Sequence, residues 1–391
     1  MANPSDLSAG RAASCRKVGT PARFETTKRP NDQTTPPARR PECGRMIHHN
    51  EQIFLAEPRM RAFKPLPNLD NHEGQPRRVG VELEMAGLES EDLAEAVTAV
   101  IGGRFEPESP FSGTVHDTEL GDFRIELDAS VLTERRHLEL FDRLGLTLDE
   151  GELRDNFEAA LSKLAGLVVP HELVCPPVAL DALPQIDRIR ARLHQAGARG
   201  TGASPLYAFG LQFNIEIDSR ESAALLAVLR AFLLRFDDIV AHEQVDFSRK
   251  LTPYVQPFPE DYLAFLLDPD YAPELERLID DYLAYTPTRN RPLDLLPLFA
   301  WLDEDRVMAA PVERELIKPR PTWHYRLPNC RIDDPDWSLH AAWDEWVEVE
   351  RLAGDPERLR QLAAQRLKGS SGWRRWLAAT WRKLGAGGSG D

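Results

Sequence analysis

Hydrophobic and polar residues alternate along several short stretches of the chain, which is the spacing expected for β-strands. Between residues 78 and 85 the apolar residues occupy every second position, and Glu82 and Glu84 lie between them. Side chains two residues apart point to the same face of a strand, so this strand has one apolar and one acidic face. The same pattern predicts strands over residues 122–128, 168–174, 208–217 and 322–327.

Other stretches carry apolar residues three and four positions apart, which is typical of helices packed on a core. Ser90 can cap a helix that runs to Ile101 and ends at Gly102 and Gly103. Further helices are predicted over residues 153–167, 181–195, 221–240, 273–283, 293–301, 339–352, 356–367 and 373–384. Strands and helices are mixed along the chain, without an internal repeat, and the pattern predicts an α+β fold.

Composition divides the chain into segments. The first residues are rich in Pro, Ser, Thr, Arg and Lys and poor in large apolar residues, so we expect a disordered tail over residues 1–60. The main folded domain is predicted over residues 70–335. All eight tryptophans lie between Trp301 and Trp381. This shift predicts a helical, aromatic-packed C-terminal extension over residues 336–385, followed by a flexible tail over residues 386–391.

Charge and cysteine content narrow the class of protein. The 391 residues include 48 basic and 63 acidic ones, giving a net charge of −15. That balance opposes nucleic acid as the main partner, because binding phosphate backbones needs clustered Lys and Arg. No apolar run is long enough to span a membrane, and no apolar secretory signal opens the sequence. The four cysteines form no CxxC pair, so we expect a reduced, cytoplasmic protein.

Pairs of polar residues interrupt four of the predicted strands. Each pair is spaced two residues apart, so its members share a face: Glu82 and Glu84, Glu126 and Asp128, Gln212 and Asn214, His324 and Arg326. Together they predict one sheet with a polar face. Carboxylates gathered there stay ionised only with cations between them, and oxygen ligands suit Mg²⁺ or Mn²⁺. The alternative for any single pair is the solvated face of a sheet.

Five short motifs occur in the order found in carboxylate–amine ligases related to glutamine synthetase and glutamate–cysteine ligase. They are GVELEM, LDAS, HELVCPP, GLQFN and WHYRLP. Within that group the segment from about Arg77 to Cys330 most closely resembles the putative amidoligase family. The resemblance implies a curved, mainly antiparallel glutamine-synthetase-like sheet, with helices packed outside it. Its concave, polar face would hold ATP and two or three Mg²⁺ ions.

The same resemblance assigns roles to individual residues. It implies metal ligands at Glu82, Glu84, Asp128 and Glu172, with Gln212 and His324 at two further ligand positions. It implies contacts to the nucleotide from Glu82, Glu84, Gln212, Asn214 and Arg326, and catalytic roles for Arg326, His324 and Asp128. Arg289 and Arg320 are candidate substrate contacts, and for each the alternative is a solvated surface cation.

Two positions depart from the family pattern. Gln212 stands where the family usually has a histidine, and His324 stands where it usually has a glutamate. One hypothesis is that His324 restores a nitrogen ligand or acts as a base toward the incoming amine. The other is that a metal position is lost and activity has decayed.

The expected reaction follows the group. ATP phosphorylates a carboxylate of a small molecule or peptide, and an amine then displaces phosphate to form an amide. A catalytically silent nucleotide-binding scaffold and a metal-dependent phosphotransferase or hydrolase remain as alternatives. Residues 373–384 form a basic amphipathic helical stripe that can contact a membrane surface or a partner, or dock on the protein's own acidic body.

Overall fold

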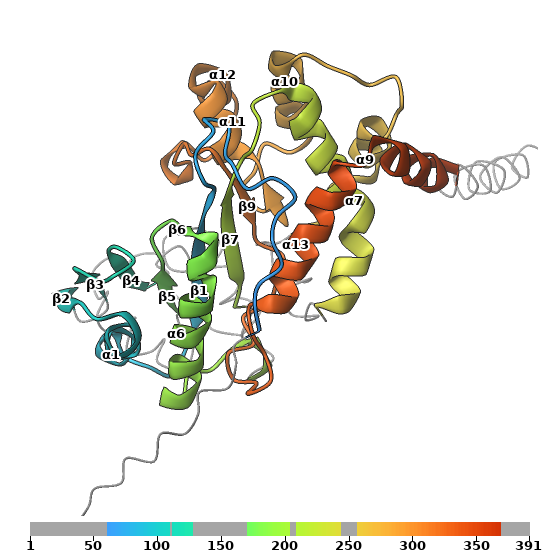
Figure 1. Cartoon of the computed structure of the whole chain (residues 1–391). Helices are drawn as coiled ribbons and strands as arrows, with labels where there is room; N and C mark the ends of the chain where they lie inside the picture. The colour runs from blue at the N-terminus through green and yellow to red at the C-terminus, as the bar shows by residue number, and fades with distance from the viewer. Residues whose placement is uncertain (1–60, 110–111, 128–169, 204–208, 244–255, 369–391) are drawn as a thin grey trace, which may run out of the picture. The chain divides into compact units, whose positions relative to one another are not determined.

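The computed structural model divides the chain into two compact units, Met1–Glu57 and Pro58–Asp391. The structure describes residues 61–109, 112–127, 170–203, 209–243 and 256–368, all in the second unit (Figure 1). The expected tails over 1–60 and 386–391, the predicted helices over 153–167 and 373–384, and Asp128 lie outside the described residues.

One open sheet organises the described part of the chain. Its strands run in the order β2-β3-β4-β5-β1-β7-β9-β8, with β6 paired to β1, and every pairing is antiparallel (Figure 1). The strands are β1 (Arg78–Met85), β2 (Arg104–Ser109), β3 (Ser112–His116), β4 (Phe123–Leu127), β5 (His171–Val174), β6 (Val178–Ala179), β7 (Leu211–Glu216), β8 (Leu293–Asp294) and β9 (Thr322–Tyr325). The prediction of a mixed fold with an antiparallel sheet is confirmed.

Helices pack around this sheet. They are α1 (Ser90–Ile101), α6 (Leu183–Ala196), α7 (Ser222–His242), α9 (Glu260–Leu266), α10 (Leu275–Tyr285), α11 (Leu296–Leu302), α12 (Glu304–Ala309) and α13 (His340–Ala353), with single 3₁₀ turns at Leu180–Ala182, Thr201–Ala203 and Arg314–Leu316. Residues 356–368 are also helical. No helix in the described residues combines the length and apolar character needed to cross a membrane.

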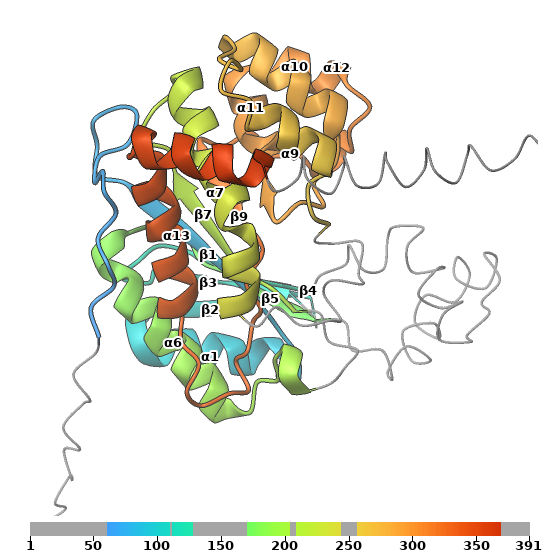
Figure 2. The same cartoon turned by 90° about the vertical axis from the view of Figure 1, so that its right-hand side faces the viewer.

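The helices α13 and α7 lie side by side against β7 and β9 (Figure 2). Trp343 of α13 packs edge-on to Phe213 of β7, with ring centroids 5.6 Å apart. Trp346 lies 5.5 Å from the ring of Tyr325 in β9. Burial of such aromatic rings is a large source of stability, so α13 shares the core of the sheet. The predicted C-terminal extension begins at residue 336, and α13 lies within it.

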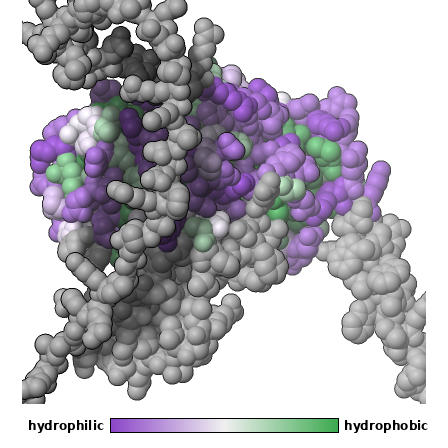
Figure 3. Space-filling view, turned by 90° about the horizontal axis from the view of Figure 1, so that it is seen from below, coloured by the Kyte–Doolittle hydropathy of each residue, from purple (hydrophilic) through white to green (hydrophobic). Residues whose placement is uncertain are grey.

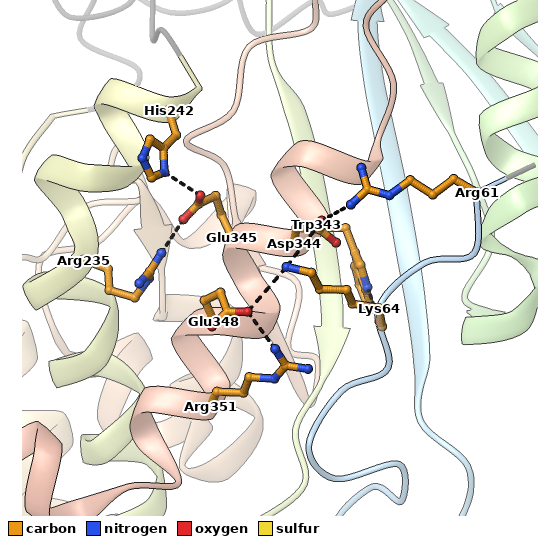
Figure 4. Close-up of polar contacts among 9 residues, drawn as sticks. All are labelled: Arg61, Lys64, Arg235, His242, Trp343, Asp344, Glu345, Glu348 and Arg351. Carbon is orange, nitrogen blue, oxygen red and sulfur yellow. Dashed lines mark hydrogen bonds and ion pairs between the residues drawn. The ribbon is translucent and has the colours of Figure 1, made fainter.

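Ion pairs hold α13 on both flanks (Figure 4). On one side Arg61 donates to Asp344 over 2.8 Å. On the other, Arg235 and His242 of α7 both contact Glu345, at 2.7 and 2.8 Å.

The described surface seen in Figure 3 is largely hydrophilic, with hydrophobic residues in small groups.

A buried ion pair joins the start of β1 to α13. Arg77 is 1% exposed, and two of its nitrogens donate to the two carboxylate oxygens of Glu350, over 2.8 and 2.7 Å. Its Nε donates to the backbone oxygen of Glu216 over 2.7 Å, and Nη1 also reaches the backbone oxygen of Asn68 at 3.2 Å. All three guanidinium nitrogens therefore have partners within the protein.

Two local predictions are wrong. Glu89, not Ser90, caps α1: its backbone N–H donates to the Asp92 carboxylate, while Ser90 is the first residue of the helix and is buried. The predicted helix over 293–301 is a short strand followed by a helix. Leu293 and Asp294 pair with β9, and the helix begins at Leu296. Pro297 suits that first turn, where its missing N–H is not needed.

The hairpin of β2 and β3 was not predicted. Its outer strand, β2, is almost entirely exposed and contains Pro107, so its sequence lacks an apolar alternation. The pairing shifts register between Pro107 and Ser109. Proline has no N–H for the ladder, and it is tolerated here because β2 is an edge of the sheet.

Candidate active site

The face of the sheet turned away from the core residues carries a row of three glutamates. Glu84 of β1 lies opposite Glu172 of β5, and Glu172 lies opposite Glu126 of β4. Directly opposed residues in an antiparallel sheet share a face and lie close together. The alternation that predicted the acidic side of β1 thus correctly predicts that several strands contribute to one polar face.

A second row crosses the other half of the sheet. Asn214 of β7 lies opposite His324 of β9, which in turn lies opposite Asp294 of β8. Glu82 lies opposite Gln212 between the two rows. The sheet topology therefore brings together polar residues that are more than two hundred positions apart in the sequence.

A pocket of about 150 Å³ opens on this face. Its acidic side is the set of three carboxylates that the strands contribute, Glu82, Glu126 and Glu172. Its basic side is the set of three cations from outside the strands, Arg289, Lys318 and Arg320; Arg124 of β4 also lines the pocket. Gln212, His324, Val174, Pro297 and Leu316 complete the lining. The two sets approach each other where Arg320 lies 4.0 Å from Glu82.

A chain of amide groups fixes Glu82. The side-chain nitrogen of Gln212 donates to the Asn214 oxygen over 2.8 Å. Asn214 in turn donates to Oε1 of Glu82 over 2.6 Å. Arg320 approaches the same carboxylate oxygen to 4.0 Å. In this arrangement Gln212 keeps its oxygen as an acceptor at the pocket, and Glu82 is held in one orientation.

Glu84 lies on the polar face, as the spacing predicted, and contacts the backbone beside β7. Its Oε2 accepts a hydrogen bond from the backbone N–H of Gly210 over 2.7 Å, which ties β1 to the residues just before β7. Glu84, Asn214 and Arg326 share the polar face but do not line the pocket. Of the predicted site residues, the lining contains Glu82, Glu172, Gln212, His324, Arg289 and Arg320.

His324 is almost completely buried at the base of the pocket, with 2% of the residue exposed. Its Nδ1 lies 3.1 Å from the backbone oxygen of Thr322. Burial lowers the pKa of His324 well below its usual value, and the nearby charges of Arg289, Arg320 and Arg326 lower it further. A neutral imidazole that donates from Nδ1 to a carbonyl has its lone pair on Nε2.

Asp294 is a site residue that the sequence did not reveal. It is 0% exposed, and its Oδ2 accepts a hydrogen bond from Nε of Arg289 over 2.9 Å. Nη1 of Arg326 lies 4.0 Å from the same oxygen. In the sequence, Asp294 sits within a leucine-rich run and resembles one polar position of a helix.

Residues 75–348 match the sequence model of a protein family described as "putative amidoligase enzyme". The match covers well over half of the chain and includes the whole pocket. The chain belongs to this amidoligase family. It is therefore an enzyme of the carbon–nitrogen ligase type, as the order of its motifs indicated. Neither curated proteins nor solved structures gave a match to the chain.

The amidoligase family assignment directs attention to metal binding. Carboxylate oxygens from Glu82, Glu126 and Glu172 are the ligand type that Mg²⁺ prefers. In the described residues, however, no group of three or more His, Cys, Asp or Glu side chains surrounds a point where an ion could sit. Glu126 is paired with Arg124 at 2.7 Å, and Glu82 accepts from Asn214. The donor chemistry of this amidoligase fits a hard cation, and ion binding would require these side chains to exchange partners.

Proposed function

We propose that the protein is an ATP- and Mg²⁺-dependent ligase that joins a carboxylate to an amine on a small amino compound or a peptide. The observation that carries this proposal is the mixed lining of the pocket, because a metal–phosphate complex needs both carboxylate oxygens and cationic side chains. Its cation would face Glu82, Glu126 and Glu172. Its phosphate oxygens would face Arg289, Lys318 and Arg320.

The pocket size refines this picture. Its volume of about 150 Å³ is smaller than the roughly 300–1,000 Å³ of sites that enclose a drug-sized ligand. The described walls would therefore enclose the phosphate end of ATP and the reacting carboxylate. Mg²⁺, when bound, would neutralise the negative charge that spreads over the phosphate oxygens during transfer.

The reaction would proceed in two balanced steps. An oxygen of the substrate carboxylate attacks the terminal phosphorus of ATP, and ADP leaves. The nitrogen of the amine then attacks the acyl carbon, and inorganic phosphate leaves. The attacking nitrogen must lose a proton, and His324, which lines the pocket, is the candidate group to accept it. Enclosure of the pocket would limit hydrolysis of the acyl phosphate.

The remaining expectations belong to the same proposal. The order of the motifs supports a curved, glutamine-synthetase-like sheet, and the cysteine content supports a cytoplasmic location.

One observation favours a second function, a catalytically silent nucleotide-binding scaffold. Asn214 donates to Oε1 of Glu82 over 2.6 Å and so occupies an oxygen that a metal ligand would need. If this bond is permanent, nucleotide could bind without turnover. A hydrolase on the same sheet would release phosphate without consuming an amine, and a phosphotransferase would pass the phosphoryl group to an acceptor without forming an amide.

The decisive experiment measures phosphate release from ATP in the presence of Mg²⁺, with panels of carboxylates and amines. A ligase requires both substrates, whereas a hydrolase releases phosphate without the amine and a scaffold releases none. The variant Glu82→Gln/Glu172→Gln should lose at least about a hundredfold in rate, since both carboxylates line the acidic side. Glu260→Gln is the matched control, because Glu260 is exposed and pairs only loosely with Arg366.

Thermal unfolding gives a second reading of the same variants. ATP and Mg²⁺ together should stabilise the wild type by about 2.7 kcal/mol at a hundredfold excess over the dissociation constant. The double variant should lose this gain, while Glu260→Gln keeps it. Equal stabilisation of all three proteins would contradict the placement of the nucleotide on the acidic side.

A further inference from the structure

Asp294 stands out among the buried charges of this protein because it connects to the pocket without lining it. It lies in the two-residue strand β8, opposite His324 of β9, and is 0% exposed. A carboxylate so deeply buried is costly unless it is paired and hydrogen-bonded. The inference below rests on the proposed function, since it concerns how the pocket would bind phosphate.

Both oxygens of Asp294 have partners. Oδ1 accepts the backbone N–H of Leu296 over 3.0 Å, at the start of α11. Oδ2 accepts Nε of Arg289 over 2.9 Å and lies 4.0 Å from Nη1 of Arg326. One carboxylate thus serves two guanidinium groups that come from different segments of the chain.

These contacts fix the direction of Arg289. Besides the bond from Nε, its Nη1 donates to the backbone oxygen of Leu316 over 2.6 Å. Two of the three guanidinium nitrogens are therefore used on the protein side. The third, Nη2, belongs to a side chain that lines the pocket and is 23% exposed.

Arg326 is tied to the same unit. Its Nη1 donates to the backbone oxygen of Arg289 over 2.9 Å. The two guanidinium groups carry two positive charges against the single negative charge of Asp294, which leaves one positive charge on the unit. Lys318 and Arg320 add two more cations on the same side of the pocket.

We propose that Asp294 is a positioning residue that holds Arg289 in the orientation from which it binds a phosphoryl group in the pocket. The remaining charge favours a phosphoryl group over a single carboxylate. A carboxylate carries one negative charge, whereas a polyphosphate can neutralise the whole basic side and accept several hydrogen bonds from guanidinium forks.

The test is calorimetric titration with inorganic tripolyphosphate, without Mg²⁺, of the folded full-length chain. Asp294→Asn keeps an oxygen for the Leu296 N–H but removes the charge that orients Arg289. It should weaken binding about tenfold, the loss expected for one charge-assisted hydrogen bond. In the assay of phosphate release it should raise KM for ATP more than it lowers kcat.

The matched control is Asp187→Asn. Asp187 also pairs with an arginine, Arg190, over 3.2 Å, and also accepts a backbone N–H, from Leu339 over 3.1 Å. Neither residue lines the pocket. The Asp187→Asn variant should bind tripolyphosphate with the affinity of the wild type. An equal loss in both variants, or no loss in Asp294→Asn, would overturn the assignment.

Two further measurements make the test independent of folding and of the ligase proposal. In an Arg289→Gln background, Asp294→Asn should cause no additional loss of affinity, because Asp294 acts through Arg289. If Asp294→Asn does not fold, Arg289→Lys takes its place. Lysine keeps the charge but cannot contact both Asp294 and Leu316 as the fork does, so wild-type affinity in Arg289→Lys would contradict the proposal.

The outcomes also separate this inference from the proposed function. Tripolyphosphate binding that depends on Asp294, in a protein that forms no amide, supports the inference while the ligase proposal fails. Wild-type protein that does not bind tripolyphosphate overturns the inference whatever the ligase assay shows. Citrate, a polycarboxylate, should bind more weakly than tripolyphosphate. If Asp294→Asn weakens citrate binding more than it weakens tripolyphosphate binding, the phosphoryl assignment is overturned.

Discussion

Two buried arginine–carboxylate pairs lie at different places in this fold and differ in one respect. Arg77 and Glu350 join β1 to α13, and every nitrogen of Arg77 donates to a protein oxygen. Arg289 and Asp294 lie beside the pocket, and within the described residues the side chain of Arg289 donates only through Nε and Nη1. The first pair is saturated within the protein, whereas the second leaves a guanidinium edge for a ligand.

This difference separates a structural from a functional use of the same chemistry. Arg77 uses four of its five N–H donors within the protein and does not line the pocket, so loss of this pair should affect folding and not ligand binding. An unsaturated pair is held just as firmly, yet it presents charge to a pocket. The number of unused donors therefore distinguishes the two uses better than burial does, since both carboxylates are buried.

The largest expected effect comes from breaking the saturated pair. Glu350→Gln leaves the charge of Arg77 buried without a counter-charge, which should lower the free energy of unfolding by about 3–5 kcal/mol. Urea unfolding measures this loss. Glu348→Gln on the same helix is the control and should lose less than about 1 kcal/mol, because Glu348 is partly exposed. Folded Glu350→Gln should bind tripolyphosphate as the wild type does, and a weaker affinity would erase the distinction between the pairs.

A buried carboxylate to which the described part of the chain brings no arginine within bonding distance sharpens the comparison. Glu243 follows α7 and is 6% exposed. Burial raises its pKa to about 7, the neighbouring charge of Glu345 adds to the rise, and Arg331 and His242 oppose it. Because the folded state holds this proton more tightly than the unfolded state, the contribution of Glu243 to stability is full below about pH 4.5. It is lost as pH rises to about 7.

Glu243→Gln should remove this dependence on pH. Relative to the wild type, the variant should gain stability between about pH 4.5 and 7, reaching roughly 3 kcal/mol above pH 7. Urea unfolding at pH 5 and pH 8 measures the difference. An identical change at both pH values would mean that Glu243 titrates normally in the folded protein.

The smallest effect is expected at Arg320, a cation on the same side of the pocket without a buried carboxylate to orient it. Its side chain is 37% exposed and lies 4.0 Å from Glu82. Arg320→Gln should weaken tripolyphosphate binding by no more than about threefold, and salt should reduce the difference. Calorimetric titration at low and high salt measures it. A tenfold loss would mean that orientation by a buried carboxylate is not what makes a cation of this pocket effective.

The sequence was most informative where one face of a strand is apolar and the other polar. For β1 the alternation predicted both ends of the strand and the shared direction of Glu82 and Glu84. Long amphipathic helices such as α7 and α13 were also predicted, because a buried stripe imposes a regular spacing. These elements derive their pattern from a single apolar surface, which a sequence records directly.

Asp294 and Glu84 show where sequence patterns stop being sufficient. A strand of only two residues cannot be recognised inside the run LDLLPL. The hydrogen bond between Arg289 and Asp294 forms where this strand, β8, pairs with β9. Glu84 has the spacing of a ligand, yet its carboxylate binds the backbone of Gly210. Both outcomes depend on tertiary contacts between distant segments, which local spacing does not encode.

The exposed strand β2 has a consequence for the behaviour of many copies of this protein together. An open edge of a sheet can recruit a strand from another molecule and so begin aggregation. Pro107 removes one of the N–H groups such a strand would need, and Arg104, Glu106 and Glu108 place charges along the same edge. The hairpin that extends the sheet thus also limits its growth, which protects the chain against filament formation when it is crowded.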